Sequence, residues 1–155
     1  MKPNIPLTYL PKRLSRKDRK RQYHQLLLSR KAYQKGKYVN RPQISSYPHR
    51  PSRHLYTLRK KYGVENATPT PELSKATGCS IEAMKRIIRK GEGAYFSSGS
   101  RPNQTAQSWG LARLASSLTG NKSALVDYHI LEEGCDPKKP ALRLARLSRR
   151  KRTST

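Results

Sequence analysis

Acidic residues are scarce in this sequence of 155 residues, which has 9 Asp and Glu against 34 Lys and Arg. The formal net charge at pH 7 is therefore +25. Such an excess of one sign repels itself unless polyanions compensate it, so we expect nucleic acid, an acidic protein surface or anionic lipid as partners. Apolar residues make up only 34% of the chain, which argues against one large hydrophobic core.

Long apolar runs and cysteines are also lacking. No run is long enough for a membrane-spanning helix, and the start of the chain has no apolar segment of the kind found in secretory signals. The two cysteines are Cys79 and Cys135. They can form a disulfide, but two free, buried thiols in a reducing intracellular setting are the state that we expect.

The patterns that carry enzyme chemistry are missing as well. The Gly-Glu-Gly at 91–93 follows an expected helix rather than a strand and lacks a third glycine, and no Gly-Lys-Ser/Thr phosphate loop is present. A serine nucleophile would need a positioned histidine, but the side chains of His129 and Asp127 diverge on a helix. The cysteines and histidines lack metal-ligand spacing. We therefore expect a non-enzymatic protein with no catalytic residue, no metal and no cofactor.

The positive charge is concentrated at the two ends of the chain. Residues 1–61 carry a net charge of +17, residues 62–140 carry +2, and residues 141–155 carry +6. A nearly neutral middle can fold as an ordinary small domain, whereas basic arms need a partner to become ordered. We expect an extended arm at 1–14, a basic helix at 15–36, a Pro-rich basic linker and the start of a short helix at 37–61, a helical core domain at 62–140, and a basic C-terminal helix and tail at 141–155.

The basic helix has clear boundaries. Ser15 with Asp18 three residues later is a typical N-terminal cap, and Gly36 stops the helix. Its expected apolar stripe consists of Tyr23, Leu26, Leu27, Arg30 and Tyr33. Before it, Tyr9 and Leu10 are expected to anchor the proline-bearing arm on a partner.

The linker mixes basic and aromatic residues before its pattern becomes helical near Pro51, with Leu55, Leu58 and Tyr62 on one face. This mixture suits stacking on nucleic acid, but tyrosines that pack against a partner protein are an equal alternative. The mixed residues are Tyr38, Arg41, Tyr47, His49, Arg50, Arg53, His54 and Tyr56.

Residues 70–91 have the capping residues and terminating glycines of a helix-turn-helix. Thr70 caps a helix that Gly78 ends, and Ser80 caps a second helix that Gly91 closes. The pair resembles the motif of bacterial repressors and recombinases, although the second helix has no Asn or Gln to read adenine, so a packed pair is the main expectation. Its candidate nucleic-acid or anion-binding residues are Lys85, Arg86, Arg89 and Lys90. The remaining helices expected are one that starts near 105 and is ended by Gly120, one at 122–134 and one at 141–152, which makes the protein all-α.

The stretch GEGAYFSSGSRPNQTAQSW, residues 91–109, is expected to be an ordered loop. Its polar side chains can satisfy their own backbone. Arg101 is a candidate for binding a phosphate or a partner carboxylate. Tyr95, Phe96 and Trp109 either anchor a partner or brace the loop internally, and the sequence favours neither alternative.

The signature YFSSGSRPNQT…SW…ARLAS…VD.HIL..GC resembles one family of uncharacterised basic proteins encoded by large double-stranded DNA viruses and some phages. The resemblance implies a viral setting: the virion, and the host cytoplasm or nucleus during assembly. It implies no catalytic residues. With the charge pattern, it leads us to expect a minor capsid or core-associated protein that contacts virion proteins, DNA or anionic lipid headgroups. The alternative is a DNA-binding regulator or genome-condensing protein that uses the helix pair 70–91, and a third possibility is an enzyme acting on nucleic acid through the Ser/Arg loop.

Overall fold

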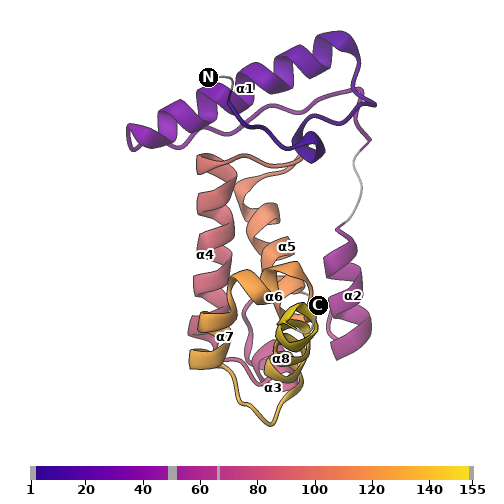
Figure 1. Cartoon of the computed structure of the whole chain (residues 1–155), viewed down its shortest axis with the longest axis vertical. Coiled ribbons are helices and arrows are strands. Elements are labelled where there is room, and N and C mark those ends of the chain that lie inside the picture. The colour runs from indigo at the N-terminus through magenta and orange to yellow at the C-terminus, as the bar shows by residue number, and fades with distance from the viewer. Residues whose placement is uncertain (1–2, 49–51, 66, 154–155) are drawn as a thin grey trace. The chain divides into compact units, whose positions relative to one another are not determined.

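The structure is a computed structural model that describes residues 3–48, 52–65 and 67–153. Within these ranges it has eight α-helices, one 3-10 turn and no strand, which confirms the expected all-α fold (Figure 1). The elements are η1 (Leu7–Tyr9), α1 (Arg16–Gln34), α2 (Arg53–Tyr62), α3 (Pro71–Thr77), α4 (Ile81–Ser97), α5 (Ala106–Leu118), α6 (Lys122–Val126), α7 (Tyr128–Gly134) and α8 (Pro140–Thr153). The helix start expected near Pro51, together with His49 and Arg50, lies outside the described residues.

The chain forms two compact units, and the boundary between them falls within α4 and α5. The first unit comprises Met1–Arg50 and Glu92–Trp109, and the second comprises Pro51–Gly91 and Gly110–Thr155. Each unit is therefore built from segments that are distant in sequence. Most of the polar stretch 91–109 belongs to the first unit, together with the basic N-terminal residues.

Helix α1 begins where the sequence predicts, but its buried face is only partly the predicted one. The Ser15 hydroxyl accepts the Asp18 main-chain N–H at 3.1 Å, which confirms the predicted N-cap. The buried residues of the helix are Asp18, Gln22, Leu26 and Ser29. Only Leu26 of the predicted apolar stripe is among them, and Tyr33 is exposed. Tyr23, Leu27 and Arg30 are half-buried, so the predicted stripe is confirmed only in part, and the buried polar residues were not predicted.

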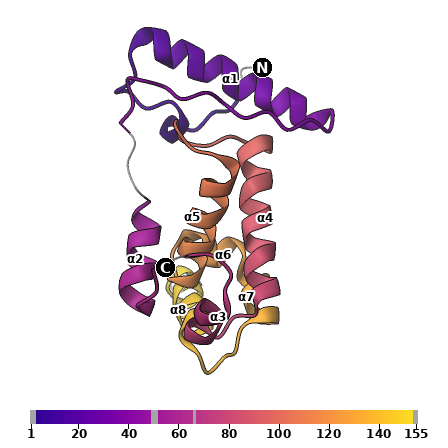
Figure 2. The ribbon, with the colours of Figure 1, turned by 180° about the vertical axis from the view of Figure 1, so that it is seen from behind.

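Polar partners from the rest of the first unit explain why α1 buries polar side chains. Residues 37–48 run back along the helix in both views (Figures 1 and 2). The main-chain N–H of Ser46 in this segment donates to Asp18 Oδ2 at 3.0 Å. Gln22 donates to the Tyr9 carbonyl oxygen at 3.3 Å. Because buried polar groups are tolerated when hydrogen-bonded, these contacts select the polar face of the helix.

The helix pair α3 and α4 has the predicted caps. The Thr70 hydroxyl accepts the Leu73 N–H at 3.2 Å, and the Ser80 hydroxyl accepts the Ala83 N–H at 3.1 Å. Gly78 follows α3 with φ of +84°, a left-handed conformation that favours glycine. The prediction of two helices joined by a Gly-Cys-Ser turn is confirmed.

Helix α4 continues through Gly91 to Ser97, so the prediction that Gly91 closes the helix is wrong. The first seven residues of the expected loop 91–109 are helical. Glycine is needed at position 91 for packing: a Cβ there would lie 2.7 Å from the Cα of Gly110 and 3.2 Å from the Cβ of Arg113. Gly91 therefore lets α4 and α5 approach closely, which is a common use of glycine inside a helix.

The second unit is organised around one apolar core. Its large, fully buried side chains are Leu58, Leu73, Met84, Ile87, Leu114, Leu118, Ile130, Leu131 and Leu142. They come from all of α2 to α5, α7 and α8, and Ala124 adds α6. The helix expected at 122–134 is split at the buried Asp127 into α6 and α7. In α8, Leu142 and Ala145 are buried in the core, whereas Leu147 is half exposed.

The two cysteines form a disulfide, so the expectation of free thiols is wrong. Cys79, in the turn between α3 and α4, and Cys135, after α7, face each other in an isolated antiparallel bridge. Main-chain bonds flank the pair: Ser80 N–H donates to the Gly134 carbonyl and Asp136 N–H to the Gly78 carbonyl, both at 2.8 Å.

The packing of Gly91 gives a testable contrast with Gly93, two residues further along the same helix. Gly91→Ala should lower the free energy of unfolding by about 1 kcal/mol or more, because the new methyl group must displace the backbone of Gly110. Gly93→Ala meets nothing within 4 Å and should raise it by up to about 1 kcal/mol through helix propensity. Urea denaturation followed by circular dichroism measures both. Changes of the same sign in the free energy of unfolding of the two variants would contradict the close contact between Gly91 and Gly110.

Candidate anion-binding site

Helix α8 exposes a group of positive charges. Its sequence PALRLARLSRRKRT contains no acidic residue. Because Ala141, Leu142 and Ala145 are buried in the core, the charged side chains are left on the exposed side. These exposed cations are Arg143, Arg146, Arg149, Arg150, Lys151 and Arg152.

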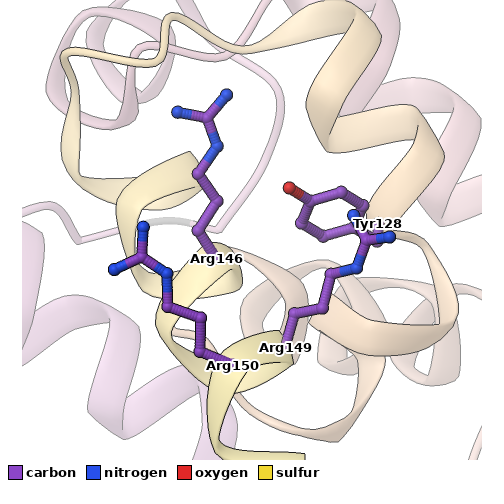
Figure 3. Close-up of a pocket in the computed structure, with 4 residues that line it drawn as sticks. All are labelled: Tyr128, Arg146, Arg149 and Arg150. Carbon is purple, nitrogen blue, oxygen red and sulfur yellow. The ribbon is translucent and has the colours of Figure 1, made fainter. Parts of the chain in front are cut away.

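Three of these arginines line a hollow with Tyr128. Arg146, Arg149 and Arg150 have the i, i+3, i+4 spacing that places side chains on one face of a helix. With Tyr128, the first residue of α7, they line a space of about 280 Å³ (Figure 3). The guanidinium carbon of Arg149 lies 4.6 Å from the centre of the Tyr128 ring, a cation–π distance. The figure shows this guanidinium lying across the ring, with Arg146 and Arg150 extending from the same helix.

A buried ion pair fixes the position of Tyr128. The preceding residue, Asp127, is fully buried and binds Arg113 of α5 through two hydrogen bonds of 2.8 Å, from Nε to Oδ2 and from Nη2 to Oδ1. Bidentate pairs of this kind are geometrically specific. The hydrogen bonds to Asp127 raise the pKa of Arg113 above its ordinary value, against the opposing effect of burial. The carboxylate therefore anchors the start of α7 and, with it, the aromatic wall of the hollow.

The lining of the hollow has the chemistry of an anion-binding site. Guanidinium groups match the oxygens of phosphates and carboxylates bidentately. The four lining residues include no carboxylate, thiol or histidine that could act as a nucleophile or a general base. The site was not among the sequence-predicted candidates. The i, i+3, i+4 arginines of a helix that contains no acid were the signal for it.

The predicted cations of α4 are partly compensated. Arg86 pairs with Glu133 at 2.8 Å, and Arg89 pairs with Glu82 at 3.0 Å. The hydrogen bond and charge of Arg86 lower the pKa of Glu133. Both pairs are largely exposed, so each contributes little stability, but each reduces the local positive charge.

The other two α4 candidates are exposed. Lys90 Nζ lies 3.4 Å from His129 Nε2, and Lys85 carries its charge into solvent. Two of the four cations on this face are therefore paired with acids.

Arg101 is exposed, while its neighbours stabilise the first unit. Asn103 accepts the Ile44 N–H at 2.6 Å and donates its own amide to the carbonyl oxygens of Ile44 and Tyr47 at 3.1 and 2.7 Å. It holds φ of +64°, which asparagine tolerates better than most residues. Of the two alternatives for this stretch, the contacts of Asn103 support internal bracing.

Arg41 is the central cation of the first unit, and sequence reasoning placed it only within a mixed basic and aromatic segment. Its guanidinium carbon lies 3.7 Å from the centre of the Tyr95 ring. The Nη1 group donates to the Ser29 hydroxyl at 2.8 Å and to the Tyr95 carbonyl at 2.7 Å, and Nη2 donates to the Ser100 hydroxyl at 2.8 Å. Burial lowers the pKa of Arg41. Arg41 is the only Lys or Arg between residues 38 and 49, and this isolation was the available signal.

Most of the proposed partner-anchoring residues pack within the first unit. Tyr95 is buried, with its hydroxyl accepting the Arg41 N–H at 3.1 Å. Phe96 contacts the rings of Tyr38 and Tyr95, with centres 5.1 Å apart in each case. Tyr9 and Trp109 meet edge to face at 6.0 Å. Leu10 is half-buried and lines a second hollow.

Asp18 is the only acid among residues 1–61, and it is buried. Besides the Ser46 N–H, it accepts the Ser45 hydroxyl at 3.4 Å. Hydrogen bonds from the side chain and the main chain of Ser46 lower the pKa of Asp18 below its ordinary value of 3.8. The carboxylate therefore joins α1 to the returning segment 37–48 as an ionised group.

These bonds predict a pH dependence. A lowered pKa means that ionised Asp18 stabilises the first unit above its ordinary pKa, and that this stabilisation is lost as pH falls through the lowered pKa. Asp18→Asn should therefore be less stable than the natural protein near pH 7, with the difference shrinking as pH falls below the ordinary pKa of Asp18. Urea denaturation of both proteins across this range tests the point, and a pH-independent difference would contradict it.

The fold and its sites define a small all-α protein with cation-rich helices in both units. Within the described ranges, no helix is long and apolar enough to cross a membrane, and no cluster of three metal-binding side chains is present. A protein-family model matches residues 6–139, and the chain belongs to that family, a family of unknown function designated DUF5824. No curated protein and no solved structure matches the chain.

Proposed function

We propose that this protein is a non-enzymatic structural component of a large DNA-virus particle, a minor capsid or core-associated protein. In this proposal it docks on other virion proteins and neutralises an acidic surface or the packaged genome. The viral setting is the one that the signature of residues 95–135 implies. The virion is accordingly its proposed location, with the host cytoplasm or nucleus during assembly.

The observation that carries the proposal is the exposure of cations on two helices that present no acid to solvent. Helix α1 exposes Arg16, Lys17, Arg19, Lys20, Arg21 and Lys31, and its single acid is buried. Helix α8 exposes six cations and has no acid. Releasing counterions from an anionic partner favours binding to such surfaces without sequence recognition. A neutralising, structural role needs no more than this.

The alternative role, a DNA-binding regulator that uses the helix pair 70–91, has less support. Such a protein reads bases with side chains of its second helix. Two of the four α4 cations are paired with Glu82 and Glu133, and the turn is tied to residue 135 through the disulfide. Asn and Gln, the usual readers of adenine, are absent from Ile81–Ser97.

The arginine hollow of α8 gives a direct binding test. Arg146→Ala should weaken the binding of duplex DNA and reduce the slope of log affinity against log salt by about 1, because one phosphate contact is lost. Arg143→Ala removes the same charge from the same helix but lies outside the hollow, and should leave the slope nearly unchanged. Fluorescence anisotropy over a salt series measures both variants. Equal reductions of the salt slope in the two variants would show that the hollow does not bind phosphate more than the rest of α8 does.

The structural role predicts the behaviour of the protein in particles. We expect mass spectrometry of purified virions to find it at a fixed ratio to the major capsid protein. It should remain with the particles after a high-salt wash, because apolar docking supports part of the binding and is not screened. Recovery only from infected-cell extracts, and never from particles, would contradict the proposal.

A further inference from the structure

The first unit has a second hollow with a different chemistry. Leu10, Arg16, Arg19, Lys20 and Tyr23 line a space of about 390 Å³ whose accessible inner surface is almost entirely apolar. The floor is therefore formed by carbon atoms of these side chains, and the charged groups of three of them are at the rim. A hollow with an apolar floor and a cationic rim is suited to a ligand that has both properties.

Two segments of the first unit form the walls of this hollow. Arg16, Arg19, Lys20 and Tyr23 follow the i, i+3, i+4, i+7 spacing of one face of α1. Leu10, directly after η1, comes from the other wall.

The N-terminal segment that carries Leu10 is fixed on both sides. Gln22 donates to the Tyr9 carbonyl, and the Tyr9 ring packs edge to face on Trp109. Upstream, Arg30 Nη2 donates to the Asn4 carbonyl at 3.1 Å. The segment that carries Leu10 is therefore held in place by contacts within the protein, so the hollow is preorganised for a ligand.

The rim charge is uncompensated within α1. Asp18 is the only acid in the helix, and its carboxylate is buried and bound to Ser45 and Ser46. Arg16, Arg19 and Lys20 are exposed. A partner that enters this hollow therefore gains by carrying negative charge around an apolar group.

The chemistry of the hollow selects among anionic partners. A second copy of this chain is disfavoured, because a protein with net charge +25 repels itself. An anionic membrane is matched by a broad apolar helix face, whereas α1 buries Asp18, Gln22 and Ser29 on one side and offers a single hollow on another. A nucleic-acid base presents polar edges, and the inner surface offers almost no polar atoms to pair with them.

We propose that this hollow binds an acidic protein segment by one projecting apolar side chain, with flanking carboxylates paired to Arg16, Arg19 and Lys20. The inference rests on the proposed function, because it names the kind of virion-protein segment on which the protein docks. Leu10 and Tyr23 receive the apolar side chain. The three cations fix the segment around it and exclude neutral or basic segments.

Two synthetic peptides test the apolar contact on the full-length protein. One is composed of Asp, Glu and Ser with a single central Leu, and the other has Ser in place of that Leu. Fluorescence anisotropy should show the Leu peptide binding about tenfold more tightly, because a leucine side chain leaves water. Equal affinity for the two peptides would overturn the inference, whereas the polyanion binding of α8 would be unaffected.

Matched variants on α1 locate the contact. Tyr23→Ser should abolish the preference for the Leu peptide, whereas Tyr33→Ser, which removes an exposed tyrosine outside the hollow, should preserve it. Arg19→Gln should weaken both peptides several-fold more than Arg21→Gln does, since Arg21 lies outside the hollow. If circular dichroism shows that Tyr23→Ser does not fold, the comparison of Arg19→Gln with Arg21→Gln still tests the inference.

The same variants distinguish the other possible occupants and the failure of the broader proposal. Suppose that Tyr23→Ser weakens binding to a single-stranded oligonucleotide or to phosphatidylserine vesicles but leaves the peptide preference intact. The occupant would then be nucleic acid or membrane, and the inference would be overturned. The proposed function fails by a separate result, the absence of the protein from purified particles.

Discussion

The scarcity of acids is the constraint on which the rest of this structure depends. With 34 Lys and Arg and 9 Asp and Glu, most cations cannot find a carboxylate inside the protein. All three ion pairs among the described residues lie in the second unit. Other cations that support the fold, in both units, donate to neutral oxygens: Arg41 to hydroxyls and a carbonyl, Arg30 to the carbonyls of residues 98 and 4, and Arg59 to that of residue 65. Neutral acceptors satisfy these hydrogen bonds but cancel no charge.

As a consequence, the buried acids and the exposed cations have different roles. The deepest acids are structural: Asp18 joins α1 to the returning chain, and Asp127 positions the start of α7 through Arg113. Many cations of α1 and α8 lie on the exposed side of their helices. Two hollows, one lined by arginines and tyrosine and one apolar with a cationic rim, give these helices different chemistry. The proposed anion binding rests on this difference between buried acids and exposed cations.

Local signals made much of this fold predictable, whereas its tertiary partners were not. The caps at Ser15, Thr70 and Ser80 were correct because a cap depends on residues within one turn. The end of α4 and the state of the cysteines were wrong, and the buried face of α1 was right only in part, because each depends on a distant segment: Gly110 for α4, residues 45–46 for α1, and residue 135 for Cys79. Arg41 was underestimated for the same reason, since its acceptors lie 12 to 59 residues away. The cations of α4 and α8 were visible in the sequence, but only the tertiary structure showed which of them meet acids.

The central claim is that Arg30, Arg59 and Arg113 are held by oxygens of the protein, while the exposed Arg19 of α1 and Arg146 of α8 bind anionic partners in the proposed function. Arginine side-chain NMR tests it most directly, because each Nε–H gives its own signal. The account predicts that the Nε–H groups of Arg30, Arg59 and Arg113, which donate within the protein, exchange slowly with water and keep their shifts when a polyanion such as duplex DNA is added. The Nε–H signals of Arg19 and Arg146 should exchange fast and move on the same addition. Uniform exchange rates and uniform shifts across all five arginines would contradict the account.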